Sequence, residues 1–406
     1  MRKTRILSLA LCAILILSFA AGCGGNEKPA SKKSHDRETY VITGNEEGKI
    51  EPHNFVAGKC TMCDETTIFR QEPMASTKNI LNYDAPAGHK GTIVEIWYKT
   101  RAYGVESKHA EYEGKLHIVK RAYVYLPAGY DANDTSKKYN VLYKMHGNKL
   151  NEGYWFRSGS YASESAWSAY TAGYGTENML DWMYDNLDIE DTIIVTPTLY
   201  NYYYNDKQGD ELGGDAEVGN LYYGYIDPDF ERIEEAVTKE EGADGVWYME
   251  FMNDLMPYIV ENFNTYAAST ADADLIAARD HVGFTGLSRG GGICSGILNN
   301  CFPYVSYFAW ESGGGPGQAF FDKYNSEWKD KYPINFLFLS CGSSENPVGT
   351  AQNMLNAKTT LGLKEGSDIA NGDRIAYVTI NGTAHNYATW ITDFYNEMLV
   401  FFKVQN

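Results

Sequence analysis

The chain has 406 residues, of which 44% are apolar, and this is enough to bury the core of one large or two modest globular domains. Its net charge of −18 argues against nucleic acid or an anionic membrane surface as a partner, because both would repel it. Tyrosine is unusually abundant, with 32 copies, which suits either an aromatic binding face or an unusual surface composition.

The first 22 residues have the layout of a secretory signal. Three cations precede an uncharged, largely apolar run at 6–21, which is too short for a confident membrane span. The sequence AAGC at 20–23 resembles a bacterial lipoprotein signal, in which the cysteine becomes the lipidated first residue. We expect residues 1–22 to be removed and Cys23 to anchor the protein outside the cell, with an ordinary cleaved signal as the alternative. Removal of three cations and no acids would change the net charge from −18 to −21.

Two short segments precede the main domain. Residues 23–45 are polar and lack an apolar period, so we expect a flexible tether. Residues 46–90 form a small segment in which His53, Cys60 and Cys63 make an H-x6-C-x2-C pattern. A structural zinc needs four ligands and only three are visible, so zinc, a local disulfide and free thiols all stay open. The chemistry expected below requires no cofactor.

Residues 91–406 alternate strand-like and helix-like segments, which predicts a layered α/β domain with a mostly parallel sheet. Apolar patterning places strands at 91–104, 115–127, 139–147, 192–198, 281–286, 304–310, 334–340 and 374–380. Helical spacing places helices at 176–187, 247–263, 289–300, 350–361 and 387–402. We expect Pro257 to kink the second of these helices. The irregular region at about 200–245 should cover one end of the sheet.

Residues 286–290 read Gly-Leu-Ser-Arg-Gly, a G-x-S-x-G pentapeptide. A strand-like segment precedes it and a glycine-rich helix start follows, which predicts a strained turn that exposes Ser288 as a nucleophile. In such folds the catalytic residues follow the chain order serine, acid, histidine. Of the eight histidines only His385 lies beyond the serine, so it is the expected base.

The acid should follow a neighbouring strand of the sheet, which leaves Glu345 and Glu311. We favour Glu345, because it follows the strand next in sequence to the histidine loop. The backbone N–H groups of Arg289 and Asn148 are the expected oxyanion donors. His146 precedes the serine and is expected to support the Asn148 loop.

Several ordered motifs carry a family resemblance: RAYVYLPAGYD at 121–131, KKYNVLYKMHGN at 137–148 with Trp155 shortly after, VTPT at 195–198, GLSRGG at 286–291, G-x-x-E at 342–345 and GTAHNYATW at 382–390. Over residues 91–403 they resemble the esterase D-type α/β-hydrolases, in particular carbohydrate esterase family 1. This family includes feruloyl and acetylxylan esterases. The resemblance implies an α/β-hydrolase fold and supports Ser288, Glu345, His385 and the two oxyanion donors, although Arg289 stands where methionine is common and Glu345 where aspartate is frequent.

The expected function is hydrolysis of esters on plant cell-wall polysaccharide, with feruloyl esters of xylan first and acetyl esters second. A siderophore or other small-molecule esterase and a non-catalytic carbohydrate-binding surface protein are the alternatives. The expected partner is a polysaccharide or aromatic ester. We expect the protein to bind the membrane through its lipid anchor only. Aromatic side chains could stack on sugar or feruloyl rings, and the candidates are Trp155, Tyr200, Tyr202, Tyr203 and Tyr222.

Overall fold

The computed structural model describes residues 55–56, 59–60, 68–74, 78–107, 110, 113–115, 117–148, 150–156, 175–200, 225–226 and 245–404. The expected leader and lipidation site at Cys23, the tether, His53 and Cys63 lie outside these residues. Cys60 is described only by its backbone, in a two-residue strand β2 (Lys59–Cys60) that pairs with β1 (Phe55–Val56).

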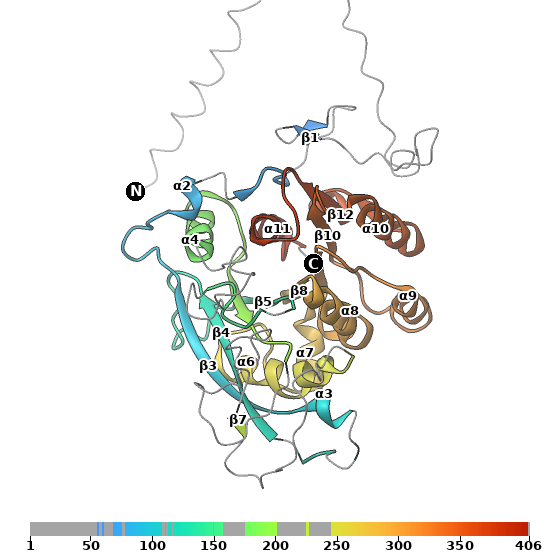
Figure 1. The fold of residues 1–406 in the computed structure, drawn as a ribbon. Helices are drawn as coiled ribbons and strands as arrows, with labels where there is room; N and C mark the ends of the chain where they lie inside the picture. The colour runs from blue at the N-terminus through green and yellow to red at the C-terminus, as the bar shows by residue number, and fades with distance from the viewer. Residues whose placement is uncertain are drawn as a thin grey trace, which may run out of the picture.

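One mixed sheet of ten strands forms the centre of the molecule (Figure 1). Its order is β11-β12-β10-β9-β8-β5-β6-β4-β3, and β7 pairs with β4 away from this path. The strands are β3 (Thr92–Arg101), β4 (His117–Leu126), β5 (Asn140–Met145), β6 (Thr192–Thr196), β7 (Tyr225–Ile226), β8 (Val282–Leu287), β9 (Tyr307–Glu311), β10 (Phe336–Gly342), β11 (Lys364–Glu365) and β12 (Asp373–Ile380). From β6 to β11 all neighbours are parallel, whereas β3 and β4 form an antiparallel edge, so the sheet is mostly parallel, as the sequence predicts.

Helices cover both faces of the sheet. The helical segments of eight residues or more are α4 (Thr176–Asn186), α8 (Arg289–Cys301), α10 (Pro347–Leu361) and α11 (Tyr387–Val400). The shorter ones are α2 (Lys78–Leu81), α3 (Tyr103–Glu106), α5 (Trp247–Glu250), α6 (Met256–Asn262), α7 (Asp272–Ala277) and α9 (Gln318–Lys323). Single 3-10 turns lie at Arg279–His281, Phe302–Tyr304 and Ile369–Asn371.

Alternate residues of one strand enter different cores. On β5, Val141 and Tyr143 pack with α5, α6, α8, α9 and α10, whereas Leu142 packs with α2, α4 and α11. Successive side chains of a strand point to opposite faces, so the sheet separates two apolar layers. Every residue of β5, β6, β8, β9 and β10 is buried, which explains why these strands read as continuous apolar runs.

The predicted elements are present, with shifted ends and some additions. The helix expected at 247–263 is divided into α5, a π-helical turn at Phe251–Leu255, and α6, and Pro257 lies in the first turn of α6. Helix α7 was not expected from the sequence, and neither was α9 with the π-helical turn that follows it at Tyr324–Trp328. No helix within the described ranges is long and apolar enough to cross a membrane.

Residues before the expected domain boundary at 91 pack onto the domain that holds the large sheet. Phe69 is buried with its ring 5.3 Å from that of Phe338. The Met74 N–H donates to Thr392 Oγ1 of α11 at 2.8 Å. The described part of segment 46–90 that begins at residue 68 therefore belongs to the same packed unit as the sheet.

Candidate active site

Ser288 lies at the turn between β8 and α8, where the parallel strands end. It has φ 52° and ψ −117°, a conformation that is costly for a residue with a side chain. Its N–H donates to the carbonyl of Glu311 at the end of β9, which fixes the turn to the sheet. A Cβ on Gly286 would lie 2.2 Å from the Gly290 carbonyl oxygen, so only glycine permits so close a turn.

Three side chains from different loops form one hydrogen-bonded row. Ser288 Oγ lies 2.8 Å from His385 Nε2, and His385 Nδ1 lies 2.7 Å from Glu345 Oε1. His385 lies in the loop between β12 and α11, and Glu345 follows β10. The carboxylate accepts the Nδ1 hydrogen, which leaves the Nε2 lone pair directed at the serine hydroxyl. In this state His385 can take the hydroxyl proton.

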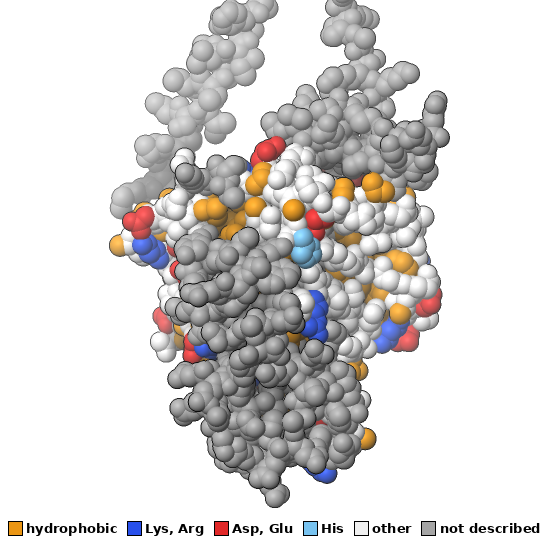
Figure 2. Space-filling view, in the orientation of Figure 1, with side chains coloured by type: hydrophobic (Ala, Val, Ile, Leu, Met, Phe, Trp, Pro, Cys, Tyr) orange, Lys and Arg blue, Asp and Glu red, His pale blue; other side chains and the backbone are white. Residues whose placement is uncertain are grey.

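The side chains of this row differ in how far they are exposed to solvent. The His385 side chain is 42% exposed, whereas that of Glu345 is 12% exposed. Figure 2 shows a histidine at the surface of the described residues, with an acidic group above it and a basic group below it. A substrate can therefore reach the imidazole while the carboxylate stays largely shielded from water.

The Glu345 carboxylate is held by donors other than the histidine. Its Oε2 accepts from the Gly342 N–H at 2.5 Å and from Ser312 Oγ at 2.9 Å. Trp390 Nε1 in turn donates to Ser312 Oγ. Burial alone would raise the pKa of Glu345, but the hydrogen bonds from His385, Gly342 and Ser312 outweigh it and hold the pKa below its usual value.

The acid loop and the histidine loop are joined by backbone contacts. The Ser344 N–H donates to the Thr383 carbonyl, and the Gly382 N–H donates to Ser343 Oγ. A Cβ on Gly342 would lie 2.8 Å from the Thr383 carbonyl carbon, so this close approach also requires glycine. The two loops therefore hold Glu345 and His385 at a fixed separation.

Glu311, the alternative acid, does not reach the histidine. It is fully buried at the end of β9 and pairs with Lys144 Nζ, which also binds Glu397 Oε2 at 2.9 Å. Both residues follow parallel strands, and the sequence could not distinguish them on that ground. The direction of the side chain decides, because Glu311 points into the core and Glu345 toward the loop of His385.

The loop after β5 lies directly against the nucleophile. A Cβ on Gly147 would be 2.5 Å from Leu287 Cδ1 and 3.2 Å from the Cβ of Ser288. Asn148 Oδ1 accepts from the Arg289 guanidinium at 3.1 Å and from the Tyr200 hydroxyl at 3.4 Å. The structure thus brings the two expected oxyanion donors, Asn148 and Arg289, into contact with each other beside Ser288.

His146 is buried beside this loop, away from the row of Ser288 and His385. Its Nδ1 lies 2.7 Å from the Gly147 carbonyl and its Nε2 lies 2.9 Å from Thr198 Oγ1. Burial lowers the pKa of His146 to about 3, so the ring is neutral at physiological pH. The sequence predicts that His146 supports the Asn148 loop. It does not predict the contact with Thr198, because only the fold brings Thr198 next to His146.

The aromatic side chains that were expected to contact substrate lie in different surroundings. Trp155 is fully buried, with Lys144 Nζ 4.5 Å from its ring, so the expected substrate contact was wrong and the residue belongs to the core. Tyr200 is also buried, at 3% exposure, but its ring lies under Arg289, with 5.4 Å between guanidinium carbon and ring centroid. Tyr202, Tyr203 and Tyr222 lie outside the described residues.

The metal prediction on His53, Cys60 and Cys63 also falls on side chains outside the described residues. Among the side chains that are described, no group of three or more His, Cys, Asp or Glu could hold a metal ion. The described cysteines Cys294, Cys301 and Cys341 are buried and unbridged.

No family model matches the chain, but a curated protein and several solved structures are similar to it. The chain is 31% identical over 198 residues, or 49% of its length, to endo-1,4-beta-xylanase Y of Acetivibrio thermocellus. This match spans only 13% of the length of the xylanase.

Two solved structures share the fold over 84% of this chain and 95% of their own. One is a serine-to-alanine mutant of the feruloyl esterase module from Clostridium thermocellum, complexed with sinapinate, at 24% identity and a TM-score of 0.56. The other, described as FAE, has 23% identity and a TM-score of 0.57.

The chain has the α/β-hydrolase fold, which confirms the fold expected from the sequence. The structures that it resembles include a feruloyl esterase, so the resemblance to esterases stated from the motifs is also confirmed.

Proposed function

We propose that the chain is a secreted serine esterase that cleaves ester groups on plant cell-wall polysaccharide. The observation that carries this proposal is the row from Ser288 through His385 to Glu345, set on a strained turn at the carboxyl end of the sheet. A hydroxyl, a neutral imidazole and an ionised carboxylate in this order are the components of nucleophilic acyl transfer.

The reaction proceeds in two halves. Ser288 Oγ attacks the ester carbonyl carbon as its proton passes to His385 Nε2, and a tetrahedral oxyanion forms. The carbon–oxygen bond to the sugar then breaks, and His385 returns the proton to the leaving alcohol. Water repeats these steps on the acyl-enzyme and releases the carboxylic acid. Glu345 stabilises the imidazolium in both halves.

The oxyanion is stabilised by the N–H groups of Asn148 and Arg289. Each such donor contributes about 3 to 4 kcal/mol to the transition state in related chemistry. Arg289 is the first residue of α8, so the helix dipole also favours negative charge at this point.

Feruloyl esters of xylan are the first choice of substrate. About half of the chain is similar in sequence to a protein described as a xylanase. One solved structure with a similar fold is a feruloyl esterase module with sinapinate bound. Acetyl esters of xylan are the second choice. A siderophore is disfavoured by the net charge of −18, because an anionic siderophore would be repelled.

Export and anchoring form part of the proposal. Residues 1–22 are removed, Cys23 carries the lipid, and the enzyme acts outside the cell on a polymer that cannot enter it. Zinc, a disulfide and free thiols remain the three predictions for Cys60 and Cys63.

The test is hydrolysis of methyl ferulate, acetylated xylan and a siderophore side by side. We expect release of ferulate, and a loss of at least about a thousandfold in Ser288→Ala, because the nucleophile is absent. A Ser288→Ala variant that hydrolyses at the rate of the unmodified enzyme would show that another group performs the chemistry.

A further inference from the structure

The carbonyl of Gly147 is held by two donors, and this fixes the peptide that follows it. His146 Nδ1 lies 2.7 Å away and the Leu150 N–H donates at 3.3 Å. A carbonyl oxygen only accepts, so the Nδ1 of His146 must carry the hydrogen. No cis peptide bond occurs in the described chain, so the N–H of Asn148 points away from His146.

The other ring nitrogen of His146 accepts. The backbone N–H of Leu199 donates to Nε2 at 3.3 Å, and the Thr198 hydroxyl lies 2.9 Å from the same atom. Because a backbone N–H can donate only to a lone pair, Nε2 carries no hydrogen and the imidazole is in one defined tautomer. Thr198 Oγ1 accepts from the Tyr200 N–H, so its own hydrogen is directed to Nε2.

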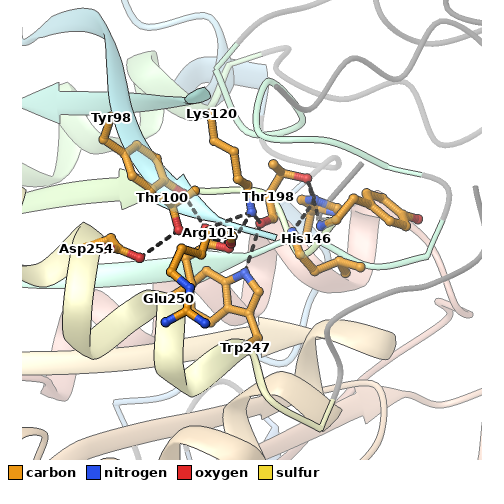
Figure 3. A network of polar contacts seen from close by, with 11 residues as sticks. Tyr98, Thr100, Arg101, Lys120, His146, Thr198, Trp247, Glu250 and Asp254 are labelled. Carbon is orange, nitrogen blue, oxygen red and sulfur yellow. Dashed lines mark hydrogen bonds and ion pairs between the residues drawn. The ribbon is translucent and has the colours of Figure 1, made fainter. Parts of the chain in front are cut away.

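Thr198 is itself held by a buried ion pair (Figure 3). Its carbonyl accepts from Lys120 Nζ at 2.9 Å and from Trp247 Nε1 at 3.1 Å. Lys120 Nζ also binds both carboxylate oxygens of Glu250, at 2.7 and 2.8 Å, and both side chains are fully buried. The ammonium therefore uses its three hydrogens, and Thr198 cannot shift without breaking charged hydrogen bonds.

We propose that this relay, from the Lys120–Glu250 pair through Thr198 and His146, holds the Gly147–Asn148 peptide so that the Asn148 N–H faces the oxyanion. Among the described residues that N–H has no hydrogen-bond partner, as a donor reserved for substrate should. His146 and Thr198 are positioning residues, since neither touches Ser288. The inference rests on the proposed function, because it concerns the transition state of ester hydrolysis.

The first experiment compares Thr198→Val with Thr198→Ser. Valine has the shape of threonine without the hydroxyl, so His146 Nε2 loses the shorter of its two hydrogen bonds and the ring holds the Gly147 carbonyl less firmly. We expect kcat to fall about tenfold or more while KM changes less than about twofold, because the oxyanion forms only after binding. Thr198→Ser keeps the hydroxyl and should restore most of kcat.

Thr192→Val is the matched control. Thr192 is fully buried like Thr198, but it lies at the opposite end of β6 and its hydroxyl binds the Glu190 carbonyl. If loss of a buried hydroxyl acted only through stability, Thr192→Val and Thr198→Val would lower the melting temperature and kcat alike. Equal kcat in the two valine variants would overturn the inference.

A second pair of variants tests His146 directly. Asparagine can place an N–H near the position of Nδ1 and donate to Gly147, whereas glutamine places its amide near Nε2. We expect His146→Asn to keep more of kcat than His146→Gln, and to bind a trifluoromethyl ketone inhibitor, which mimics the oxyanion, more tightly. The reverse order would contradict the proposal.

The two proposals fail in distinguishable ways. Ester hydrolysis by the unmodified chain, lost in Ser288→Ala but unchanged in Thr198→Val and His146→Gln, would overturn the relay and leave the esterase intact. A chain that hydrolyses none of the esters would overturn both.

Discussion

At the residue scale, the position of Glu345 distinguishes it from the other buried carboxylates. Its Oε1 binds the imidazole, and its Oε2 receives two hydrogen bonds that do not depend on the histidine. Burial raises the pKa of the carboxyl, but the hydrogen bonds from His385, Gly342 and Ser312 together lower it by more, so folding favours the ionised form. A permanent negative charge at this point fixes the tautomer of His385 and stabilises the imidazolium formed during catalysis.

Glu345→Gln should therefore lower kcat by about a thousandfold or more, because the amide can donate to Nδ1 and favour the wrong tautomer. Measured turnover of methyl ferulate gives the size of the effect. Glu311→Gln is the comparison, since Glu311 pairs with Lys144 and does not touch His385. Normal turnover in Glu345→Gln together with loss in Glu311→Gln would transfer the acid role to Glu311.

At the element scale, the turn between β8 and α8 depends on glycines whose neighbours leave no room. A Cβ on Gly290 would lie 2.5 Å from the His146 carbonyl oxygen and 2.9 Å from that of Met145. The helix therefore packs its backbone directly on the end of β5. This contact joins the nucleophile to the loop of Gly147 and Asn148, so a shift of α8 would disturb both parts of the site.

Gly290→Ala should destabilise the fold by roughly 1 to 3 kcal/mol and reduce activity further than this loss explains, because the helix must move away from β5. Gly292→Ala is the matched control. A Cβ there has nothing within 4 Å, and alanine should stabilise the helix by roughly 0.5 to 1 kcal/mol. Chemical denaturation and turnover measured on both variants test this. Equal behaviour of the two would show that the close contact is unimportant.

The sequence predicts most of this element and much of the site, for physical reasons. Strand and helix periodicity locate the turn, and the order of serine, acid and histidine leaves a single histidine. The sequence favours Glu345 over Glu311 only through the order of the strands, since the choice itself depends on the direction of the two side chains. The prediction that Trp155 contacts substrate was wrong, because the sequence does not show whether an aromatic side chain after β5 faces the substrate or the core.

At the scale of the whole molecule, the core contains a charge imbalance. Lys144 lies among Glu311, Glu397 and Asp393, and all four side chains are fully buried. Burial, and then the charge of Glu311, raise the pKa of Asp393 and of Glu397 well above their ordinary values. Folding therefore favours the protonated form of both carboxyl groups.

This imbalance predicts how stability changes with pH. A carboxyl whose pKa is raised on folding binds its proton more tightly in the folded chain, so stability falls as pH rises above the unfolded value of about 4. Asp393→Asn removes one such group, and we expect it to raise the melting temperature more at pH 8 than at pH 5. Asp322→Asn, at an exposed position, should leave the pH dependence unchanged. Parallel curves for the unmodified protein and Asp393→Asn would contradict the assignment.

The most direct test of the central claim is to detect the covalent intermediate. The protein is mixed with methyl ferulate, quenched with acid within the first turnovers, digested and examined by mass spectrometry. We predict a feruloyl adduct on the peptide that contains Ser288, and none in the Ser288→Ala variant. Hydrolysis without any adduct at Ser288, or an adduct on another residue in active enzyme, would contradict the account.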